Sequence, residues 1–185
     1  MSKLLNLIFI FIIILCYYHI KADKEIINTQ QSQIKAYQQL VNKHYQKLKK
    51  QNKYAKLIQS ENNSLKWKEC GYYADYIIFI HQQYPDIDPD IVIRLISKES
   101  SWNTWASSGI AYGLTQVNYS TWYKAYHLYS KKQLYNPFLN IEIGVDILNH
   151  YYQRSSSLKQ ALKKYSGNTT SQEYYAYIIE GGKDE

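Results

Sequence analysis

One glutamate in this 185-residue chain stands where acid catalysis could take place. In the string IVIRLISKES, Glu99 follows Val92 and Ile96 at steps that place all three side chains on one face of a predicted helix. A carboxyl group at the end of an apolar face is partly desolvated, which disfavours its charged form and raises its pKa. Such a group can donate a proton as a general acid. On spacing alone, the alternative is a glutamate at the boundary of an amphipathic face.

The surroundings of Glu99 favour a mechanism with a single acid. No Asp or Glu occurs from Ser100 through Ile141, where hydroxyl, amide and aromatic side chains are frequent. Glycosidases with two carboxylates need a second acid as base or nucleophile. Here it would have to come from Glu142, Asp146 or the Asp86–Asp90 segment, and Asp88 within that segment is already explained as a helix N-cap.

Metal and cofactor chemistry finds no support in the sequence. The five histidines are scattered, and neither HExxH nor paired-cysteine spacing occurs. No P-loop or GxSxG string is present. Cys16 lies in an apolar run and Cys70 stands alone, so we interpret Cys70 as a small half-buried residue. We expect no metal site, no cofactor and no disulfide.

The composition predicts a mainly α fold. Hydrophobic residues make up 45% of the chain but include 21 tyrosines, which excludes a polytopic membrane protein, and 7 glycines with 3 prolines are few for a β sandwich. A loop or short hairpin is expected between Ser101 and Asn118 because of its glycines. Helices are predicted for residues 71–84, 89–100, 137–154 and 158–165, and for a last helix that follows a capping box at Thr170–Glu173 and stops at Gly181-Gly182.

The N-terminal segment, residues 1–22, reads as a signal peptide or an N-terminal anchor. Lys3 precedes an apolar run from Leu4 to Tyr18, which is shorter than the ~20 residues of a membrane span. Ala22 is a candidate cleavage point, whereas Ile20 before it fits a cleavage site poorly. We therefore expect an exported protein, periplasmic or in the cell envelope, with anchoring by residues 4–18 as the alternative to cleavage.

Residues 23–66 are predicted to form a basic helical spacer. The segment has no Gly or Pro, and it carries most of the net charge of +7. Apolar residues recur at seven-residue intervals from Ile34 to Ala55, so a self-associating coiled coil is the alternative to a solvated spacer. Because the rest of the chain is nearly neutral and has no nucleic-acid motif, we expect no nucleic-acid partner. Residues 67–185 then form the globular domain.

Three strings resemble the soluble lytic transglycosylase family, in the order that the family has them. ESSWNTWASSGIAYGLTQV, from Glu99 to Val117, resembles its first two signatures. NPFLNIEIGVDIL, from Asn136 to Leu148, resembles its Asn-Pro and Asn-Ile segment. ALKKYSG, from Ala161 to Gly167, followed by Tyr175-Ala176, resembles its closing motif. The resemblance implies a small lysozyme-like helical domain that cleaves the β-1,4 bond between N-acetylmuramic acid and N-acetylglucosamine in peptidoglycan.

The resemblance also implies roles for individual residues. Glu99 matches the catalytic acid and base. The matching substrate-side residues are Ser100, Ser107, Gln116 and Tyr165, and Tyr112 is added as a sugar-stacking surface together with Trp102, Trp105, Tyr119 and Trp122. Without the resemblance, Gln116 reads as a loop amide that bonds the backbone and Tyr165 as a core ring. About half of the stacking candidates are expected in the core.

This sequence departs from the family pattern at three points. Thr115 stands in place of the usual methionine, Ser166 in place of the usual asparagine, and the span from Glu99 to Gln116 is about one residue short. The first two put the shape of the sugar pocket in question. Glu99 itself matches.

The implied reaction is a non-hydrolytic cleavage that leaves a 1,6-anhydro end. Two alternatives stay open: a hydrolase that resembles goose-type lysozyme, and a non-catalytic peptidoglycan-binding scaffold. A small domain on a stalk favours local wall opening for a secretion or conjugation apparatus over wall turnover or attack on other cells. The expected partners are therefore peptidoglycan glycan strands and such machinery.

Overall fold

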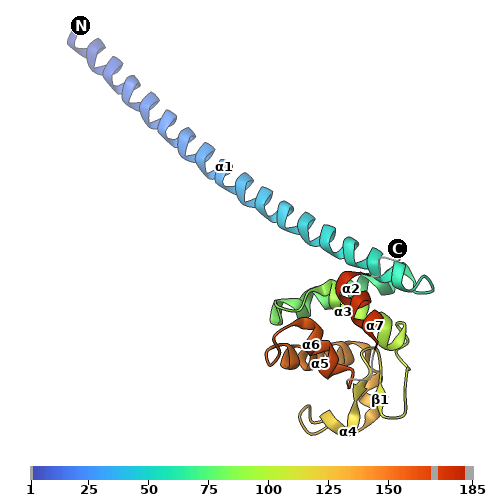
Figure 1. Ribbon diagram of the computed structural model, residues 1–185. Helices are drawn as coiled ribbons and strands as arrows, with labels where there is room; N and C mark the ends of the chain where they lie inside the picture. The colour runs from blue at the N-terminus through green and yellow to red at the C-terminus, as the bar shows by residue number, and fades with distance from the viewer. Residues whose placement is uncertain (1, 168–170, 182–185) are drawn as a thin grey trace. The chain divides into compact units, whose positions relative to one another are not determined.

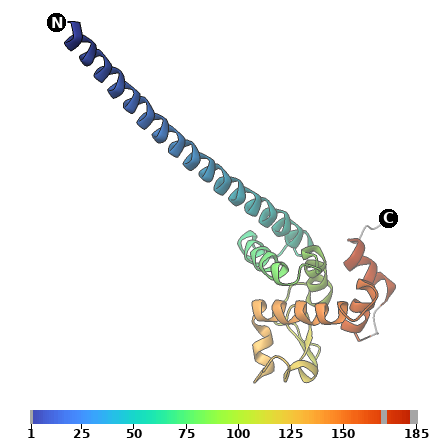
Figure 2. The same cartoon turned by 90° about the vertical axis from the view of Figure 1, so that its left-hand side faces the viewer.

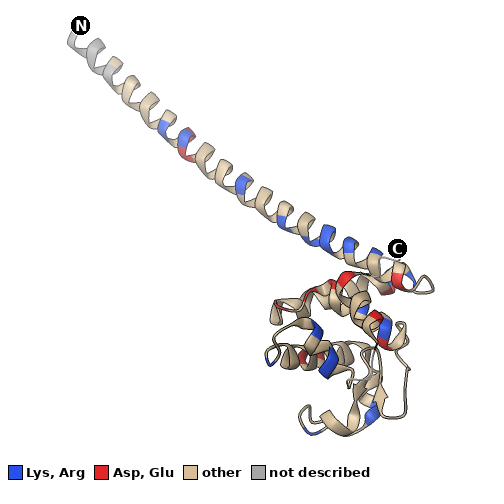
Figure 3. Cartoon of the chain, viewed as in Figure 1, with Lys and Arg blue, Asp and Glu red and all other residues tan. Residues whose placement is uncertain are grey.

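The computed structural model describes residues 2–167 and 171–181, and its contacts divide the chain into two compact units, Met1–Leu48 and Lys49–Glu185. The first unit is the greater part of one long helix, α1 (Ser2–Glu61), which runs without a break through the predicted boundary at residue 22 (Figure 1). Lysines outnumber acids along it (Figure 3). None of the helices in the described part of the chain has both the length and the apolar character of a membrane span.

From residue 11 to Leu48, the apolar side chains of the first unit are exposed. Ile34, Val41 and Leu48, members of the predicted heptad stripe, are 56%, 65% and 42% exposed. The structure also contains the helix that the sequence predicts for residues 23–66. This helix is part of α1 and ends at Glu61, close to the predicted end at residue 66. Its role as a spacer and its self-association stay predictions.

The second unit begins earlier than the predicted domain boundary at residue 67. Ala55 and Ile58, in the last turns of α1, are 1% and 0% exposed and belong to the main hydrophobic core. Ala55, the last member of the predicted heptad stripe, packs inside its own domain rather than facing solvent or another helix. The reason is that the loop after Glu61 turns the chain back at once into the next helix.

Helices make up most of the second unit, as the sequence predicts. They are α2 (Trp67–Gln83), α3 (Pro89–Ser100), α4 (Tyr119–Trp122), the 3-10 helix η1 (Lys131–Tyr135), α5 (Pro137–Tyr152), α6 (Leu158–Tyr165) and α7 (Gln172–Glu180). Figures 1 and 2 both place the β hairpin and α4 at the opposite end of this unit from α2. The mainly α class is confirmed.

The predicted caps explain several helix starts. The Asp88 carboxylate accepts from the Asp90 N–H at 2.8 Å, with Pro89 in the first turn of α3. The Asn136 side chain caps α5 in the same way, accepting from two backbone N–H groups. These two N-terminal boundaries fall where the sequence puts them.

Two other helix starts differ from the prediction. Helix α2 begins at Trp67, four residues before the predicted start at Gly71, because the Glu69 carboxylate accepts from the Lys66 N–H at 3.0 Å and caps an earlier turn. Helix α7 is capped by Ser171, whose hydroxyl accepts from the Tyr174 N–H. Thr170, predicted as the first residue of the capping box, lies outside the described residues.

The C-terminal end of α7 agrees with the sequence. Gly181, with φ of 88°, ends the helix in the left-handed conformation that glycine adopts readily. The second glycine of the predicted stop, Gly182, lies outside the described residues.

The glycine-containing stretch after α3 forms the short hairpin that the sequence allows. Strands β1 (Ala111–Tyr112) and β2 (Val117–Asn118) pair antiparallel. The turn between them is fixed to α5 by a fully buried pair: the Asn140 Oδ1 accepts from the Thr115 N–H at 2.7 Å and from the Thr115 hydroxyl at 2.8 Å. A Cβ at Gly113 would lie 2.3 Å from the Asn140 amide nitrogen, so this approach needs glycine.

Candidate active site

Glu99 lies in the last turn of α3, where a buried apolar face meets the edge of the site. Val92 and Ile96, on the same face, are 2% and 0% exposed, as their spacing predicts. The Glu99 side chain is partly buried. Its position at the end of this face is therefore the one that the sequence indicates.

A tyrosine from another helix holds the Glu99 carboxylate. The Tyr174 hydroxyl, in the first turn of α7, donates a short hydrogen bond to the Glu99 Oε1. The sequence prediction missed Tyr174, because it aligned the closing motif on Tyr175-Ala176. The signal that would have found it is the N-cap: with Ser171 as cap, Tyr174 becomes the third residue of α7 and Tyr175 turns to another side.

Burial raises the pKa of the Glu99 carboxyl. Desolvation raises the pKa of Glu99 above the ordinary value of 4.5, and the hydrogen bond from Tyr174 offsets part of that rise because it stabilises the carboxylate. Among the described residues, no second carboxylate contributes to this shift. Burial raises the pKa of Tyr165, and the Glu99 charge raises it further, so that hydroxyl lies within electrostatic reach of the carboxylate.

The chain turns sharply directly after Glu99. Ser101 and Trp102 have φ of 50° and 65°, in the left-handed region that non-glycine residues rarely adopt. The Asn62 amide, from the loop after α1, donates to the Ser101 carbonyl at 2.9 Å and caps this turn. The end of α3, with Glu99, is therefore fixed from outside the helix.

The end of α1 and the Arg94 side chain hold α7 beside α3. The Tyr177 hydroxyl donates to the Glu61 carboxylate. The Arg94 guanidinium donates to the Ile178 carbonyl at 3.1 Å. Since α7 carries Tyr174, these contacts position the hydroxyl on Glu99.

The two serines predicted on the substrate side lie on either side of this turn. The Ser100 hydroxyl donates back to the Ile96 carbonyl at 3.1 Å, within α3. The Ser107 side chain is exposed and its hydroxyl accepts from the Gly109 N–H at 3.1 Å, which leaves its own proton free to donate. Ser107 also forms an isolated bridge with Tyr112.

Gln116 and Tyr165 both bond the backbone of the hairpin. The Gln116 amide donates to the Gly113 carbonyl at 2.9 Å and to the Ala106 carbonyl at 3.2 Å, and its own φ is 50°. The Tyr165 hydroxyl donates to the Thr115 carbonyl at 2.7 Å. Both side chains thus use their donors to hold the backbone of the hairpin and of the loop before it. A role of either residue on substrate stays a prediction.

The aromatic stacking candidates separate by exposure. Trp102 and Tyr112 are 3% and 5% exposed, and the Tyr112 hydroxyl donates to the Gly109 carbonyl at 2.6 Å. Their rings are core, so Tyr112 does not offer the sugar-stacking face that the sequence prediction gave it. Trp105 is 72% exposed and packs one side against Tyr135, with ring centroids 5.1 Å apart. Tyr119 and Trp122 are intermediate.

Thr115, one of the departures from the family pattern, is part of the scaffold. Its side chain is 0% exposed and bonds Asn140, so it forms no part of a sugar-contacting surface. A Cβ at Gly144 would lie 2.2 Å from its hydroxyl, which shows how closely α5 packs on it. The second departure, Ser166, donates to the Lys163 carbonyl at 3.3 Å at the end of α6.

Two of the other acids that the sequence offered, Glu142 and Asp146, bind tyrosines elsewhere. The Glu142 carboxylate, exposed on α5, accepts from the Tyr76 hydroxyl at 3.1 Å. Asp146, one turn later, accepts from the Tyr126 hydroxyl at 2.7 Å. Neither has a contact with Glu99 among those found in the described chain.

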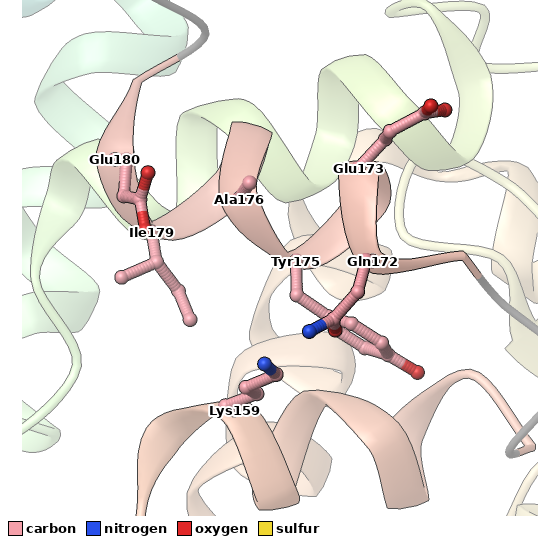
Figure 4. Close-up of a pocket in the computed structure, with 7 residues that line it drawn as sticks. All are labelled: Lys159, Gln172, Glu173, Tyr175, Ala176, Ile179 and Glu180. Carbon is pink, nitrogen blue, oxygen red and sulfur yellow. The ribbon is translucent and has the colours of Figure 1, made fainter.

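Two shallow depressions on the second unit lie away from Glu99. One, of about 270 Å³, lies between α6 and α7, where Figure 4 shows the Tyr175 ring extending toward α6 beside Lys159. The other, of about 230 Å³, lies between the end of α1 and the start of α2. Within the described residues, no group of three His, Cys, Asp or Glu side chains could hold a metal ion.

Comparison with known families gives one match. The family model described as Transglycosylase SLT domain matches residues 76–177, which is more than half of the chain and includes Glu99, Gln116, Tyr165 and Tyr174. No curated protein and no solved structure matches the chain.

Proposed function

The chain belongs to the transglycosylase SLT domain family, a family of lytic transglycosylases, and we propose that it cleaves peptidoglycan glycan strands with Glu99 as acid and base. The bond cut is the β-1,4 bond between N-acetylmuramic acid and N-acetylglucosamine. The observation that carries the proposal is the partly buried Glu99 carboxyl, whose pKa is raised by burial and which has a tyrosine rather than a second acid beside it.

In the first step, protonated Glu99 donates its proton to the glycosidic oxygen as the bond to C1 of the muramic acid breaks. The N-acetyl carbonyl of the same sugar stabilises the positive charge that develops at C1. The Tyr174 hydroxyl, already bonded to the Oε1, stabilises the carboxylate that results. Burial and Tyr174 thus act in opposite directions, one favouring the acid form and the other the base form.

In the second step, the Glu99 carboxylate takes the proton from the C6 hydroxyl of the muramic acid. The C6 oxygen then bonds to C1, which closes a 1,6-anhydro ring and returns the proton to Glu99. No water enters the products. A single carboxyl group therefore suffices, in keeping with the absence of another acid beside Glu99 in the described chain.

We assign the substrate side to side chains around the turn after α3 and the hairpin. Ser107 has a hydroxyl proton to donate, which suits the N-acetyl group. Trp105 offers one exposed ring face, which suits stacking on a sugar ring. Gln116 and Tyr165 hold the hairpin backbone in place, so we give them a positioning role. A contact of either side chain with the sugar would be an additional role.

Peptidoglycan lies outside the cytoplasmic membrane, so the proposed substrate requires an exported protein. The N-terminal pattern of Lys3 followed by the apolar run to Tyr18 supports export, by cleavage or as an anchor. Residues 23–48, exposed in the structure, suit a spacer that reaches the wall or a secretion or conjugation apparatus.

Mass spectrometry of peptidoglycan digested by the purified protein tests the proposal. We expect fragments with anhydro ends, each lighter by one water than a hydrolysed fragment. Free reducing ends would instead make the protein a hydrolase on the same fold. Binding to the wall without any released fragment would contradict an enzyme and leave a scaffold.

A further inference from the structure

A groove on the second unit lies outside the part of the chain that the family model matches. It runs between residues 51–55 of α1 and residues 67–75 of α2 and has a volume of about 230 Å³. The family match begins at residue 76, so every residue that lines the groove precedes it. Glu99 is not among them.

Two aromatic side chains line this groove without being buried by the protein. Trp67 is 46% exposed and Tyr72 is 53% exposed. The Lys68 ammonium lies 5.6 Å from the centre of the Tyr72 ring and covers part of it. Exposed aromatic rings in a depression are the surfaces on which the C–H faces of sugar rings stack.

A carboxylate in the same groove has an unmet acceptor. The Asp75 Oδ2 accepts from the Gln51 amide at 2.7 Å. The Asp75 Oδ1 is shielded from solvent, and no donor in the described chain reaches it. A buried charged acceptor without a donor is costly, so the site favours a hydroxyl or amide N–H supplied from outside the chain, with a small rotation of the Asp75 side chain.

Gly71 keeps the groove open between these groups. It lies inside α2, where glycine is less favourable than alanine, and its φ is not positive. A Cβ there would meet only the Gln51 amide nitrogen, at 3.9 Å, so packing does not require a glycine. What the missing side chain provides is free space beside Trp67 and Tyr72.

We propose that this groove is a second glycan-binding site, which stacks one sugar ring of the strand on Trp67 and Tyr72. Asp75 and Gln51 then bind the sugar's hydroxyl and N-acetyl groups. The volume is below the ~300–1,000 Å³ of typical ligand pockets, which fits a single ring of a longer strand. This identification of the ligand rests on the proposed function, because that function supplies the glycan.

The charges of the groove favour a sugar over a peptide. One ammonium, on Lys68, and one carboxylate, on Asp75, leave it without net charge. A neutral N-acetylated sugar meets both through hydroxyl and amide groups, whereas the absence of net charge gives a strongly acidic or basic peptide no overall electrostatic attraction. The site would hold a strand while Glu99 cuts it elsewhere.

The test uses the full chain with Glu99→Gln, chosen to remove the proposed acid so that the probe stays intact, and chitotetraose as the probe. The chain has 4 tryptophans, so the indole N–H resonance of Trp67 is assigned by its loss in Trp67→Phe. We expect chitotetraose to shift that resonance. No shift, while chitotetraose moves other resonances to saturation, would overturn the proposal, and so would a shift produced by a sugar-free stem peptide alone.

Binding to isolated sacculi gives the second readout. Trp67→Ala and Gly71→Leu should each weaken co-sedimentation about tenfold, the first by removing a stacking surface and the second by filling the groove. Phe79→Ala is the control, since Phe79 is a 52% exposed aromatic residue of α2 outside the groove. Unchanged binding by both groove variants, with circular dichroism like that of the unmodified chain, would overturn the site.

The failure of this site and the failure of the proposed function are separate results. Release of anhydro fragments by the protein with intact Glu99 tests the function alone. Normal fragments together with unchanged sacculus binding of Trp67→Ala would overturn only the groove. No fragments, together with a shifted Trp67 resonance, would keep the groove and overturn the enzyme.

Discussion

Glu99 and Glu142 are both glutamates that accept a hydrogen bond from a tyrosine hydroxyl, yet only one of them is placed as an acid. Tyr174 reaches Glu99 from α7, and Tyr76 reaches Glu142 from α2. Glu142 lies exposed on α5, whereas Glu99 lies partly buried at the end of an apolar face. Desolvation raises the pKa of Glu99 even though its tyrosine opposes the rise.

The difference teaches that the hydrogen-bond partner does not select the catalytic group. A tyrosine hydroxyl favours the charged form of a carboxylate wherever it binds one. Burial favours the neutral form, and it varies with position in the fold. At Glu99 the effect of burial exceeds that of the tyrosine, so the pKa of this carboxyl lies above its ordinary value.

The largest effect is expected from removing the transferable proton at Glu99. Glu99→Gln keeps the size of the side chain and should lower the rate of fragment release by at least ~10²- to 10⁴-fold, because general acid catalysis contributes about that much and the same group acts twice. Glu142→Gln is the matched control and should release fragments at nearly the unmodified rate. The measurement is the rate of anhydro-ended fragment release from sacculi.

A different outcome would reverse the comparison. If Glu99→Gln kept its activity and Glu142→Gln lost it, the acid would be Glu142, the exposed glutamate on α5. Asp146→Asn completes the set, because Asp146 is the other acid of α5 with a tyrosine partner.

The next effect concerns the end of α1, which bonds the turn after Glu99 and the helix that carries Tyr174. A chain that begins at Lys49 keeps Ala55, Ile58, Glu61 and Asn62 and should fold and cut like the full chain. A chain that begins at Ser64 loses two core residues and the bonds to Ser101 and Tyr177. We expect it to lose more than ~3 kcal/mol of unfolding free energy in urea melts, since one buried Ile→Ala change alone costs about 2–5 kcal/mol.

Point substitutions compare the buried end of α1 with its exposed part. Ile58→Ala should destabilise by roughly 2–5 kcal/mol. Leu40→Ala, at a 62% exposed position of the first unit, should change the unfolding free energy by less than ~0.5 kcal/mol. Equal changes in unfolding free energy for the two substitutions would mean that Leu40 and Ile58 are buried to the same extent, which would contradict the unit boundary at residue 48.

A smaller effect is expected from the tyrosine on the buried glutamate. Tyr174→Phe removes the bond that stabilises the Glu99 carboxylate, so the pKa of Glu99 should rise further. The alkaline limb of the pH–rate profile should move to higher pH, and the rate at neutral pH should fall about three- to tenfold because the base step loses a positioned carboxylate. Tyr76→Phe, the matched change on Glu142, should leave the profile where it is.

The raised pKa of Glu99 should also make the stability of the protein depend on pH. The pKa of Glu99 is higher in the folded chain than in the unfolded chain, so the unfolding free energy of the protein should fall as pH rises from about 4.5 through the folded pKa. Glu99→Gln removes that dependence. The variant should be more stable than the unmodified protein at neutral pH, and the gap in urea midpoints should close as pH falls toward 4.5.

Much of this arrangement could be predicted from the sequence because it depends on local rules. The spacing of Val92, Ile96 and Glu99 fixes a helix face, and Asp88 and Asn136 are caps that act within a few residues. The hairpin after α3 follows from its glycines. Each of these signals lies within one turn or one short segment.

The rest depends on contacts between distant segments, which a single sequence does not reveal. Thr115 reads as a change in the sugar pocket, but it is buried against Asn140, 25 residues away. Tyr174 and Tyr175 are equivalent candidates until the cap at Ser171 sets which of them meets α3. The end of α1 reads as a spacer because nothing local marks Ala55 and Ile58 as core.

Direct titration of the Glu99 carboxyl tests the central claim, that burial makes this residue the acid. Carbon-13 NMR of the side-chain carboxyls, with the Glu99 resonance assigned by its loss in Glu99→Gln, gives the pKa of that group alone. We predict a midpoint above 4.5 in the unmodified protein and a higher one in Tyr174→Phe. A Glu99 midpoint at or below 4.5 in both proteins would contradict the account, because burial would then not have raised the pKa of this carboxyl.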